Sequence, residues 1–468
     1  MRTLSAPMPG GLRILAAGLL ATAAVAPAQQ PTAAPAPAAV ATPPVAQPDP
    51  YLSTPAPLVE AAPAEPPAPP FGGPLLTRPK LTGDWFGARD TLRDRGITWD
   101  ISSTNFYQGV TTGGLQQGFR YGGRADYLAN INGEKAGLWK GLFIDLHGEN
   151  LYGLSVNGFT GALMPVNTAA LFPKPNTTVP ALTGMKVTQA LSESFLVFGG
   201  KINTLDGFNQ PFTGGARGTN GFMNVGMIAP VVALRTIPYS TFGAGFAYLV
   251  GPEPVLSVMV LDPNNTPTTS GFNTFFNRGV SVFGLANLPT KFLGRPGHQG
   301  AGFTYSNSKY ASLDDLPFFV LDRLRGELPP LPRETGSWSL FYMFDQTLWA
   351  DPCDPKRSWG MFGNLGIADG NPNPVRWAAN IGLGGSSPLR SRPLDTFGLG
   401  YFYVGLGDSL KNFAPRLVPL GDEQGVEAFY NVGVTPWFHI TPDIQVIVPA
   451  RERVDTSLNF GLRAKLDF

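Results

Sequence analysis

A strict two-residue alternation runs through Thr456–Phe468. Leucine, phenylalanine or alanine occupies every second position, and polar residues or glycine stand between them. Because successive side chains of a β-strand point to opposite faces, this segment has one apolar face and one polar face, whereas a helix would scatter both sets around its axis. The segment is therefore predicted to be a β-strand of a membrane barrel or of a soluble β-sandwich.

The start of the chain has the pattern of an export signal. Arg2 and Arg13 supply positive charge, Ile14–Val25 is a short apolar core, and small residues follow it. This core is too short to cross a bilayer as a helix, although a retained anchor is the alternative. Residues 1–28 are predicted to be a signal peptide that is cleaved after Ala28.

A stretch rich in proline and alanine follows the predicted signal. Such a composition cannot bury a core and favours extended conformations, so residues 29–79 are predicted to be a disordered spacer. The folded domain is expected to cover residues 80–468. It contains no run of eighteen apolar residues, which argues against a helical membrane protein.

The composition limits the chemistry that this domain can carry. Charged residues make up 14% of the chain, below the roughly 25% that is usual for soluble domains. The net charge of +1 gives no indication of nucleic-acid binding, and one cysteine with three histidines gives little material for a metal site. No nucleic-acid partner, metal or cofactor is expected.

Short segments with a period of two recur along the domain. A helix is predicted over residues 85–95, with Asp84 as its N-cap, and strands follow at residues 97–104, 119–131, 142–149, 195–203, 242–250, 255–261, 280–286, 300–306, 338–344, 360–367, 377–383, 397–405, 428–434, 444–448 and 456–468. Sixteen strands would leave about 24 residues each, enough for a membrane-crossing strand of about 9–11 residues and a connection. The long connections, such as residues 206–233, and the short turns fit an outer-membrane barrel.

Several motifs resemble one family, the carbohydrate-selective porins of the OprB type. They are Leu81–Trp85, Phe198–Asn203, Asp369–Pro372, Thr441–Gln445 and Gly461–Arg463 with the terminal Phe468. The resemblance covers residues 80–468 and implies a transmembrane, antiparallel, all-β barrel of sixteen strands. It also implies a monomer in the outer membrane of a Gram-negative bacterium, surrounded by lipid, that passes small neutral sugars. A final strand ending in Phe468 resembles the signal by which the barrel-assembly machinery recognises such proteins.

Charged residues on the polar faces of the strands are the candidate solute-binding residues. We expect them to line the pore: Arg120, Arg124, Asp126, Asp145, His147, Glu149 and Lys201 on strands, and Arg217 and Arg235 in or beside a long connection. Arginine suits this task because its guanidinium group offers several hydrogen-bond donors to sugar hydroxyls. Arg124 lies in the middle of its strand and is expected at the constriction. The alternative for each residue is an ion pair that only solvates the wall.

Three rival functions remain open: an outer-membrane barrel enzyme, a general non-selective porin and a secreted β-rich binding protein. The motif Gly407–Leu410 spells the nucleophile motif of a serine hydrolase family, but it lies in a polar loop late in the chain, and three histidines give little to build a triad. No catalytic residue is therefore expected.

Overall fold

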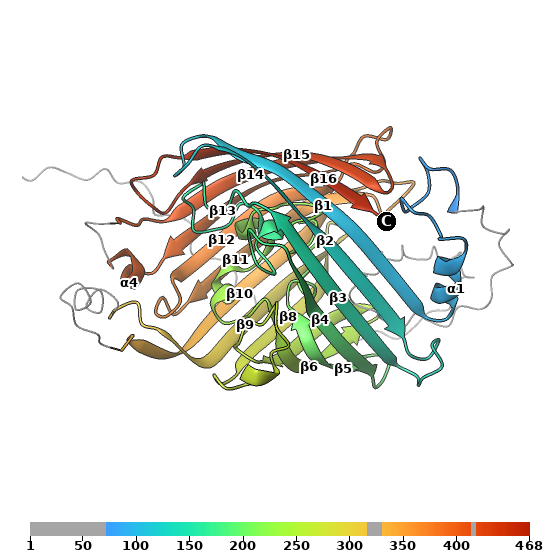
Figure 1. Cartoon of the computed structure of the whole chain (residues 1–468), viewed down its shortest axis with the longest axis horizontal. Coiled ribbons are helices and arrows are strands. Elements are labelled where there is room, and N and C mark those ends of the chain that lie inside the picture. The colour runs from blue at the N-terminus through green and yellow to red at the C-terminus, as the bar shows by residue number, and fades with distance from the viewer. Residues whose placement is uncertain (1–71, 316–329, 413–417) are drawn as a thin grey trace, which may run out of the picture. The chain divides into compact units, whose positions relative to one another are not determined.

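The computed structural model describes residues 72–315, 330–412 and 418–468, and the predicted signal peptide and most of the predicted spacer lie outside them. Within these ranges the chain forms sixteen β-strands (Figure 1). They are β1 (Ile97–Thr112), β2 (Gly118–Asn132), β3 (Leu142–Gly153), β4 (Val179–Ala190), β5 (Phe195–Asn203), β6 (Ser240–Val250), β7 (Glu253–Leu261), β8 (Ser281–Phe292), β9 (Arg295–Ala311), β10 (Arg333–Ala350), β11 (Ser358–Ala368), β12 (Val375–Ser386), β13 (Thr396–Leu406), β14 (Glu423–Thr435), β15 (Phe438–Val448) and β16 (Ser457–Asp467).

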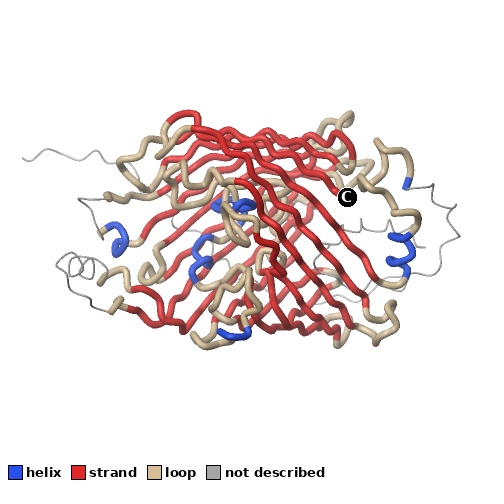
Figure 2. Tube along the Cα trace, viewed as in Figure 1, coloured by secondary structure: helices blue, strands red, loops and turns tan. Residues whose placement is uncertain are grey.

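The strands close into one antiparallel barrel. Each strand pairs with the next along the chain, and β1 pairs with β16 from Ser102 opposite Asp467 to Thr112 opposite Leu458. The strands run obliquely around the barrel, as closure requires (Figures 1 and 2). The predicted fold class and strand number are confirmed. The strand β4 is the one that the sequence pattern did not predict. His147 and Gly148 of β3 pair with Gly184 and Leu182, so Thr183 of β4 has no register partner and the alternation of β4 is interrupted there.

Short and long connections lie at opposite ends of the barrel. The pairs β6–β7, β8–β9 and β14–β15 are joined by the turns 251–252, 293–294 and 436–437. At the other end, residues 154–178, 204–239 and 262–280 form long connections. In outer-membrane barrels the short turns face the periplasm and the long loops face the outside.

The outer and inner faces of β16 follow the predicted alternation. Phe460 and Leu462 are 42% and 47% exposed on the outer face, whereas Asn459 and Arg463 are buried on the inner face. An apolar exterior and a polar interior are what a bilayer and an aqueous lumen demand of a barrel strand. The two-residue period of Thr456–Phe468 is therefore the division between lipid and lumen.

The extracellular half of the lumen is partly filled by loops. The loop 204–239 carries the short helices α2 (Val225–Ile228) and η3 (Val231–Arg235), which contact β10–β13. Phe222 of this loop is completely buried, and its ring packs edge-on against Phe362 and Phe429, with centroids 5.4 and 5.0 Å apart. The inner face of this part of the wall is therefore apolar, because the loop shields it from water.

A short helix, α1 (Ala88–Asp94), lies at the periplasmic end, close to the C-terminus (Figure 1). It confirms the predicted helix over 85–95, but its N-cap is Gly87 rather than Asp84. Arg89 of α1 donates from Nη2 to the carbonyl of Phe468 at 2.9 Å, and the N–H of Phe468 donates to the carbonyl of Ile101 at 2.9 Å. The N-terminal segment and the last residue thus hold the β1–β16 seam together.

Among the helices that the structure describes, none is both long enough and apolar enough to cross a bilayer.

Candidate functional site

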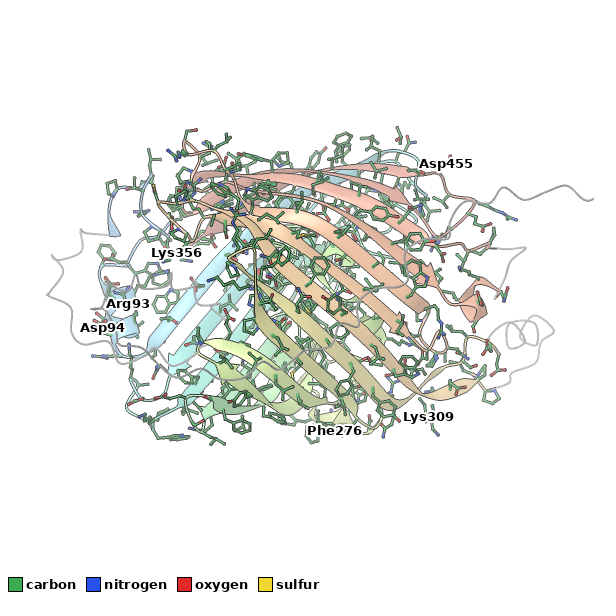
Figure 3. All side chains as sticks on the ribbon, turned by 180° about the vertical axis from the view of Figure 1, so that it is seen from behind. Arg93, Asp94, Phe276, Lys309, Lys356 and Asp455 are labelled. Atoms are coloured by element: carbon green, nitrogen blue, oxygen red, sulfur yellow. The ribbon has the colours of Figure 1, made fainter. Side chains whose placement is uncertain are left out.

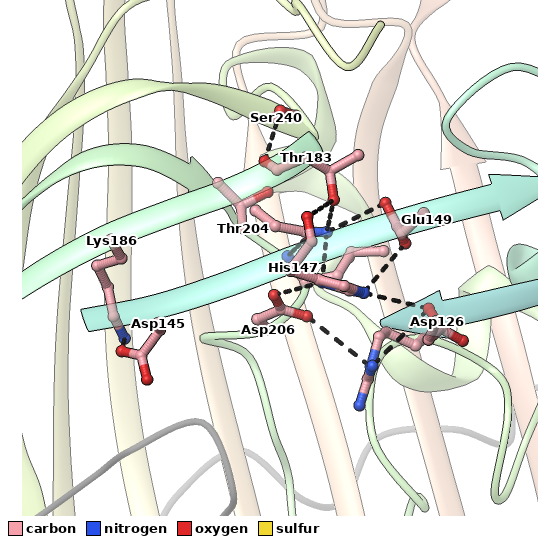
Figure 4. A network of polar contacts seen from close by, with 12 residues as sticks. Asp126, Asp145, His147, Glu149, Thr183, Lys186, Thr204, Asp206 and Ser240 are labelled. Atoms are coloured by element: carbon pink, nitrogen blue, oxygen red, sulfur yellow. Dashed lines mark hydrogen bonds and ion pairs between the residues drawn. The ribbon is translucent and has the colours of Figure 1, made fainter. Parts of the chain in front are cut away.

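A buried cluster of charged side chains lies on the inner face of β2 and β3 (Figure 4). Asp126 and Glu149 are direct partners in the strand register, an arrangement that repels unless a cation stands between them. Arg124 supplies that cation: its Nε lies 3.2 and 3.1 Å from the two Asp126 oxygens, and its Nη2 pairs with Glu149. All three are at most 1% exposed. The strand alternation explains how residues so far apart in sequence share one face.

The same cluster fixes the loop 204–239 to the wall. Nδ1 of His147 on β3 lies 2.7 Å from Oδ2 of Asp206, and its Nε2 lies 3.1 Å from Oδ1 of Asp126. Tyr239, at the end of the loop, donates a hydrogen bond from its hydroxyl group to Glu149. Arg217 in the middle of the loop stands 3.9 Å from Asp126 and 3.8 Å from Asp206. The start, the middle and the end of the loop are therefore all held against β2 and β3.

The electrostatics of Asp206 follow from this setting. Burial alone raises the pKa of its carboxyl group, but His147 and Arg217 beside it outweigh that effect and hold the pKa below its usual value. Asp206 therefore stays ionised at neutral pH and attracts the cationic groups that surround it.

Two charged residues on β14 and β16, which lie on the other side of β1 from this cluster, also hold the loop, and sequence reasoning did not single them out. Glu427 of β14 accepts hydrogen bonds from the N–H groups of Met223 and Asn224 at 2.5 and 2.9 Å. Arg463 of β16 donates to the carbonyls of Gly218 and Gly221 at 3.0 and 2.8 Å. Both occupy inward positions of alternating strands, so the available signal was an isolated charge on a lumen face. The number of loop contacts could not be inferred from that signal.

The structure brings together five of the nine predicted pore-lining residues: Arg124, Asp126, His147, Glu149 and Arg217. The other four lie elsewhere, each with its own partner.

Asp145 pairs with Lys186 at 3.3 Å, and the guanidinium groups of Arg120 and Arg235 lie over the rings of Phe159 and Tyr310 at 4.4 and 4.7 Å. Lys201 is 7% exposed and donates from Nζ to the carbonyl of Thr269 at 2.7 Å, in the loop 262–280. Lys201 was predicted to line the pore, but its ammonium group is hydrogen-bonded to this loop.

The prediction that Arg124 faces solute at the constriction does not agree with its burial. Its side chain is 1% exposed, and its nitrogen atoms donate to Asp126, Glu149 and the carbonyl of Ala169. The reason is that the loops pack over the inner face of β2 and β3, so a mid-strand position is covered and not open. Arg124 holds the wall and the loops together.

A cavity of about 590 Å³ lies in the periplasmic half of the lumen, beside the loop 204–239. Its lining alternates cations and anions: Lys80 with Asp100 at 2.6 Å, Lys465 with Asp467 at 3.4 Å, and Arg217 with Asp206 at 3.8 Å. Phe208, Asn209 and Asn220 add an aromatic face and amide groups. Of the predicted residues, Arg217 is the one that reaches this cavity, because it projects from the loop and not from the wall.

The residues Asp126, His147 and Glu149 come close enough together to hold a metal ion. The guanidinium group of Arg124 stands against both carboxylates, however, and its positive charge repels a cation. The cluster is therefore built as a network of ion pairs.

The hydrolase-like motif lies in α4 (Asp408–Lys411), and the histidines at 147, 298 and 439 interact with Asp206, Asp345 and Asn431.

Comparisons with known proteins agree with this architecture. The model of the family described as "Carbohydrate-selective porin, OprB family" matches residues 116–468. Porin B of Pseudomonas aeruginosa is 26% identical over 260 residues, which are 49% of this chain, and the match spans 56% of that relative.

Two solved structures share the fold. The high-pH structure of Pseudomonas putida OprB superposes with a TM-score of 0.72 at 21% identity and covers 83% of this chain and 98% of its own. The low-pH structure of the same protein gives a TM-score of 0.51 at 16% identity, with 84% and 99% covered. The family match extends over most of the chain, and the closed barrel has the architecture of outer-membrane porins. This chain belongs to the OprB family of carbohydrate-selective porins and is an outer-membrane protein.

Proposed function

We propose that this porin lets small neutral carbohydrates of the size of glucose, and polyols, diffuse passively through its lumen. The observation that carries the proposal is the lining of the 590 Å³ cavity, where three cations and three anions stand as neighbouring pairs. Paired charges leave little net field for an ion to follow, but they offer donors and acceptors to hydroxyl groups on every side.

The mechanism needs no covalent step, so the protein acts as a channel and not as an enzyme. A sugar exchanges hydrogen bonds with water for hydrogen bonds with Arg217, Asn209 and Asn220, which line the cavity. Passage requires that each contact is strong enough to admit the solute and weak enough to release it. Phe208 gives a sugar ring an apolar face against which it can lie.

Vesicle swelling tests the proposal. Liposomes containing the purified protein are expected to swell faster with neutral monosaccharides than with gluconate or glucosamine of similar size. A general non-selective porin would rank these solutes by size alone, and that result would refute the carbohydrate preference. An enzyme would show turnover of the solute, which chromatography of the vesicle contents detects.

Arg217→Ala tests one contact of the site. The variant should lose one or two hydrogen bonds to the sugar, worth about 0.5–1.5 kcal/mol each, so that sugar blocks the ion current several-fold less well. Lys309→Ala is the matched control, because Lys309 is an exposed cation on β9, away from the cavity (Figure 3). Equal sugar block in both variants would show that Arg217 makes no solute contact.

We further propose that the porin works as a monomer and that the barrel-assembly machinery recognises β16 through Phe468. Deleting Phe468 also removes its contacts with Arg89 and Ile101, so less heat-modifiable barrel is expected in outer membranes. Arg89→Ala is the control, because it removes one of these contacts and leaves Phe468 in place. Normal assembly without Phe468 would contradict the recognition.

A further inference from the structure

Phe212 in the loop 204–239 has an unusual backbone conformation. Its φ is +68°, in the left-handed region that residues with a side chain rarely adopt. Such a conformation costs free energy and persists where the surrounding contacts impose it, often at a functional position. Neighbouring contacts do impose it: Gln210 donates from Nε2 to the carbonyls of Phe344 and Gly363 at 2.9 and 3.1 Å, and the N–H of Phe222 donates to the carbonyl of Thr213 at 3.0 Å.

The wall is shaped to receive this residue. A Cβ atom on Gly384 of β12 would stand 2.2 Å from the carbonyl oxygen of Phe212. A Cβ atom on Gly360 of the adjacent strand β11 would stand 2.4 Å from its ring. Real Cβ contacts are never so short, so Phe212 can lie there only because both wall positions are bare backbone. The position of its ring is therefore set by close packing against β11 and β12.

Phe212 stands between two cavities of the periplasmic half of the lumen. The first is the 590 Å³ cavity, which lies against β1, β2 and β16. The second, of about 390 Å³, lies against β11–β16 and carries Phe397, Phe429 and Asn431 in its lining. The residues that line both cavities are Phe212, Gly214, Thr219, Asn220, Lys465 and Asp467.

A hydrogen bond completes the division. Lys465 of β16 donates from Nζ to Oδ1 of Asn220 at 2.7 Å, which connects the loop to the wall at the boundary of the two cavities. The loop thus touches β11 and β12 through Phe212 and β16 through Asn220. These two contacts lie between the two cavities on the periplasmic side of the loop.

We propose that Phe212 is a specificity-determining residue of this porin: its ring divides the periplasmic half of the lumen into two lobes and so limits the size of the solute that leaves. This inference rests on the proposed passage of carbohydrates and names the residue that sets the upper size limit. A monosaccharide fits one lobe, whereas a longer saccharide needs the space of both.

The test compares Phe212→Gly with the parent chain. Glycine removes the ring and adopts the left-handed conformation without cost. We expect a larger single-channel conductance in planar bilayers and a larger ratio of disaccharide to monosaccharide swelling rates in liposomes. Phe212→Tyr, which keeps the ring, should give no increase in either quantity. If Phe212→Gly does not assemble, Phe212→Asn replaces it, because asparagine tolerates the same conformation.

Phe303→Ala is the control, since it removes a phenylalanine ring from the outer face of β9, where the side chain is 42% exposed. It should leave conductance and the swelling ratio as they are. An assembled Phe212→Gly barrel with parental conductance and parental swelling ratio overturns the inference. If the parent barrel admits no sugar, the carbohydrate proposal fails, while the conductance comparison still decides whether Phe212 divides the lumen.

Discussion

Arg463 of the last strand reaches into the lumen, and its Nη1 lies 2.8 Å from the carbonyl oxygen of Gly221. The same nitrogen is 3.0 Å from the carbonyl of Gly218, and the side chain is 1% exposed. On the other side of β1, the cluster around Arg124 holds the same loop against β2 and β3. The loop 204–239 is therefore fastened to the wall on both sides of β1, and its position sets the space that remains for solute.

Arg463→Met should loosen one of these fastenings. The variant loses three charge-assisted hydrogen bonds, to the carbonyls of Gly218 and Gly221 and to the hydroxyl group of Thr441, each worth about 1.5–3 kcal/mol. It also removes the positive charge beside Glu427 and Asp443. We expect larger fluctuations of the open-channel current, because the loop then moves in the lumen. Lys309→Met removes a cation at the surface and should give the quiet current of the parent. A quiet current from Arg463→Met would show that the remaining contacts suffice.

Arg124→Ala is expected to act on stability before it acts on sugar binding. Breaking a buried ion pair from one side costs about 3–5 kcal/mol, because Asp126 and Glu149 then face each other without the guanidinium group of Arg124 between them. Chemical unfolding of the barrel in detergent measures the loss. Adding Asp126→Asn and Glu149→Gln to Arg124→Ala should recover much of it, since the stranded charges are removed.

The control for that measurement is Arg93→Ala. Arg93 pairs with Asp90 at 2.8 Å, but its side chain is 60% exposed, and such pairs contribute about 0–1 kcal/mol. An equal loss of stability in Arg93→Ala and Arg124→Ala would contradict the importance of burial in the cluster.

Asp206→Asn should reveal a dependence of stability on pH. The pKa of Asp206 is lower in the folded barrel than in the unfolded chain, so its ionised form stabilises the fold. This contribution is fully present above the unfolded pKa of about 3.9 and is lost as the pH falls through the lower folded value. The parent should therefore be the more stable protein at neutral pH, and the two should converge at acid pH. Melting curves at both pH values give the comparison, and a difference that persists in acid would contradict it.

Residues 72–96 before β1 should matter, although residues 29–71 of the predicted spacer should not. A chain that begins at Gly72 keeps the hydrogen bond from Trp437 Nε1 to the carbonyl of Leu75 at 2.7 Å and the bond from Leu81 N to Asp467 O at 2.8 Å. We expect it to conduct like the full mature chain. A chain that begins at Ile97 loses these bonds and the Lys80–Asp100 ion pair, so its barrel should melt at a lower temperature. Loss of conductance in the first chain would show that the removed residues take part in the pore.

The part of the fold that sequence could predict is the part governed by the bilayer. Phe460 and Leu462 alternate with inward polar residues because lipid and water impose opposite demands on the two faces. The pattern fails where a loop replaces water. On β13, Leu399 faces outward and Phe402 and Val404 are buried inward against the loop, so both faces are apolar and no alternation marks the interior.

The site was predictable to the same extent. Asp126 and Glu149 could be placed on one inner face, because register follows from alternation. The burial of Arg124 could not be predicted, because it depends on the path of the loop through Asp206, Arg217 and Tyr239. Loop paths depend on contacts between segments that are far apart in the chain, and a single sequence does not record those contacts.

Pairing of β1 with β16 also dictates when the barrel can form. Ser102 meets Asp467, so the seam joins the first strand of the barrel to the last strand in chain order, and contacts of such separation carry the largest entropic cost of loop closure. Until β16 is in place, β1 and β15 each expose an unpaired edge, and open edges invite aggregation. The nascent polypeptide must therefore be kept soluble, from the ribosome across the periplasm, until its last strand arrives.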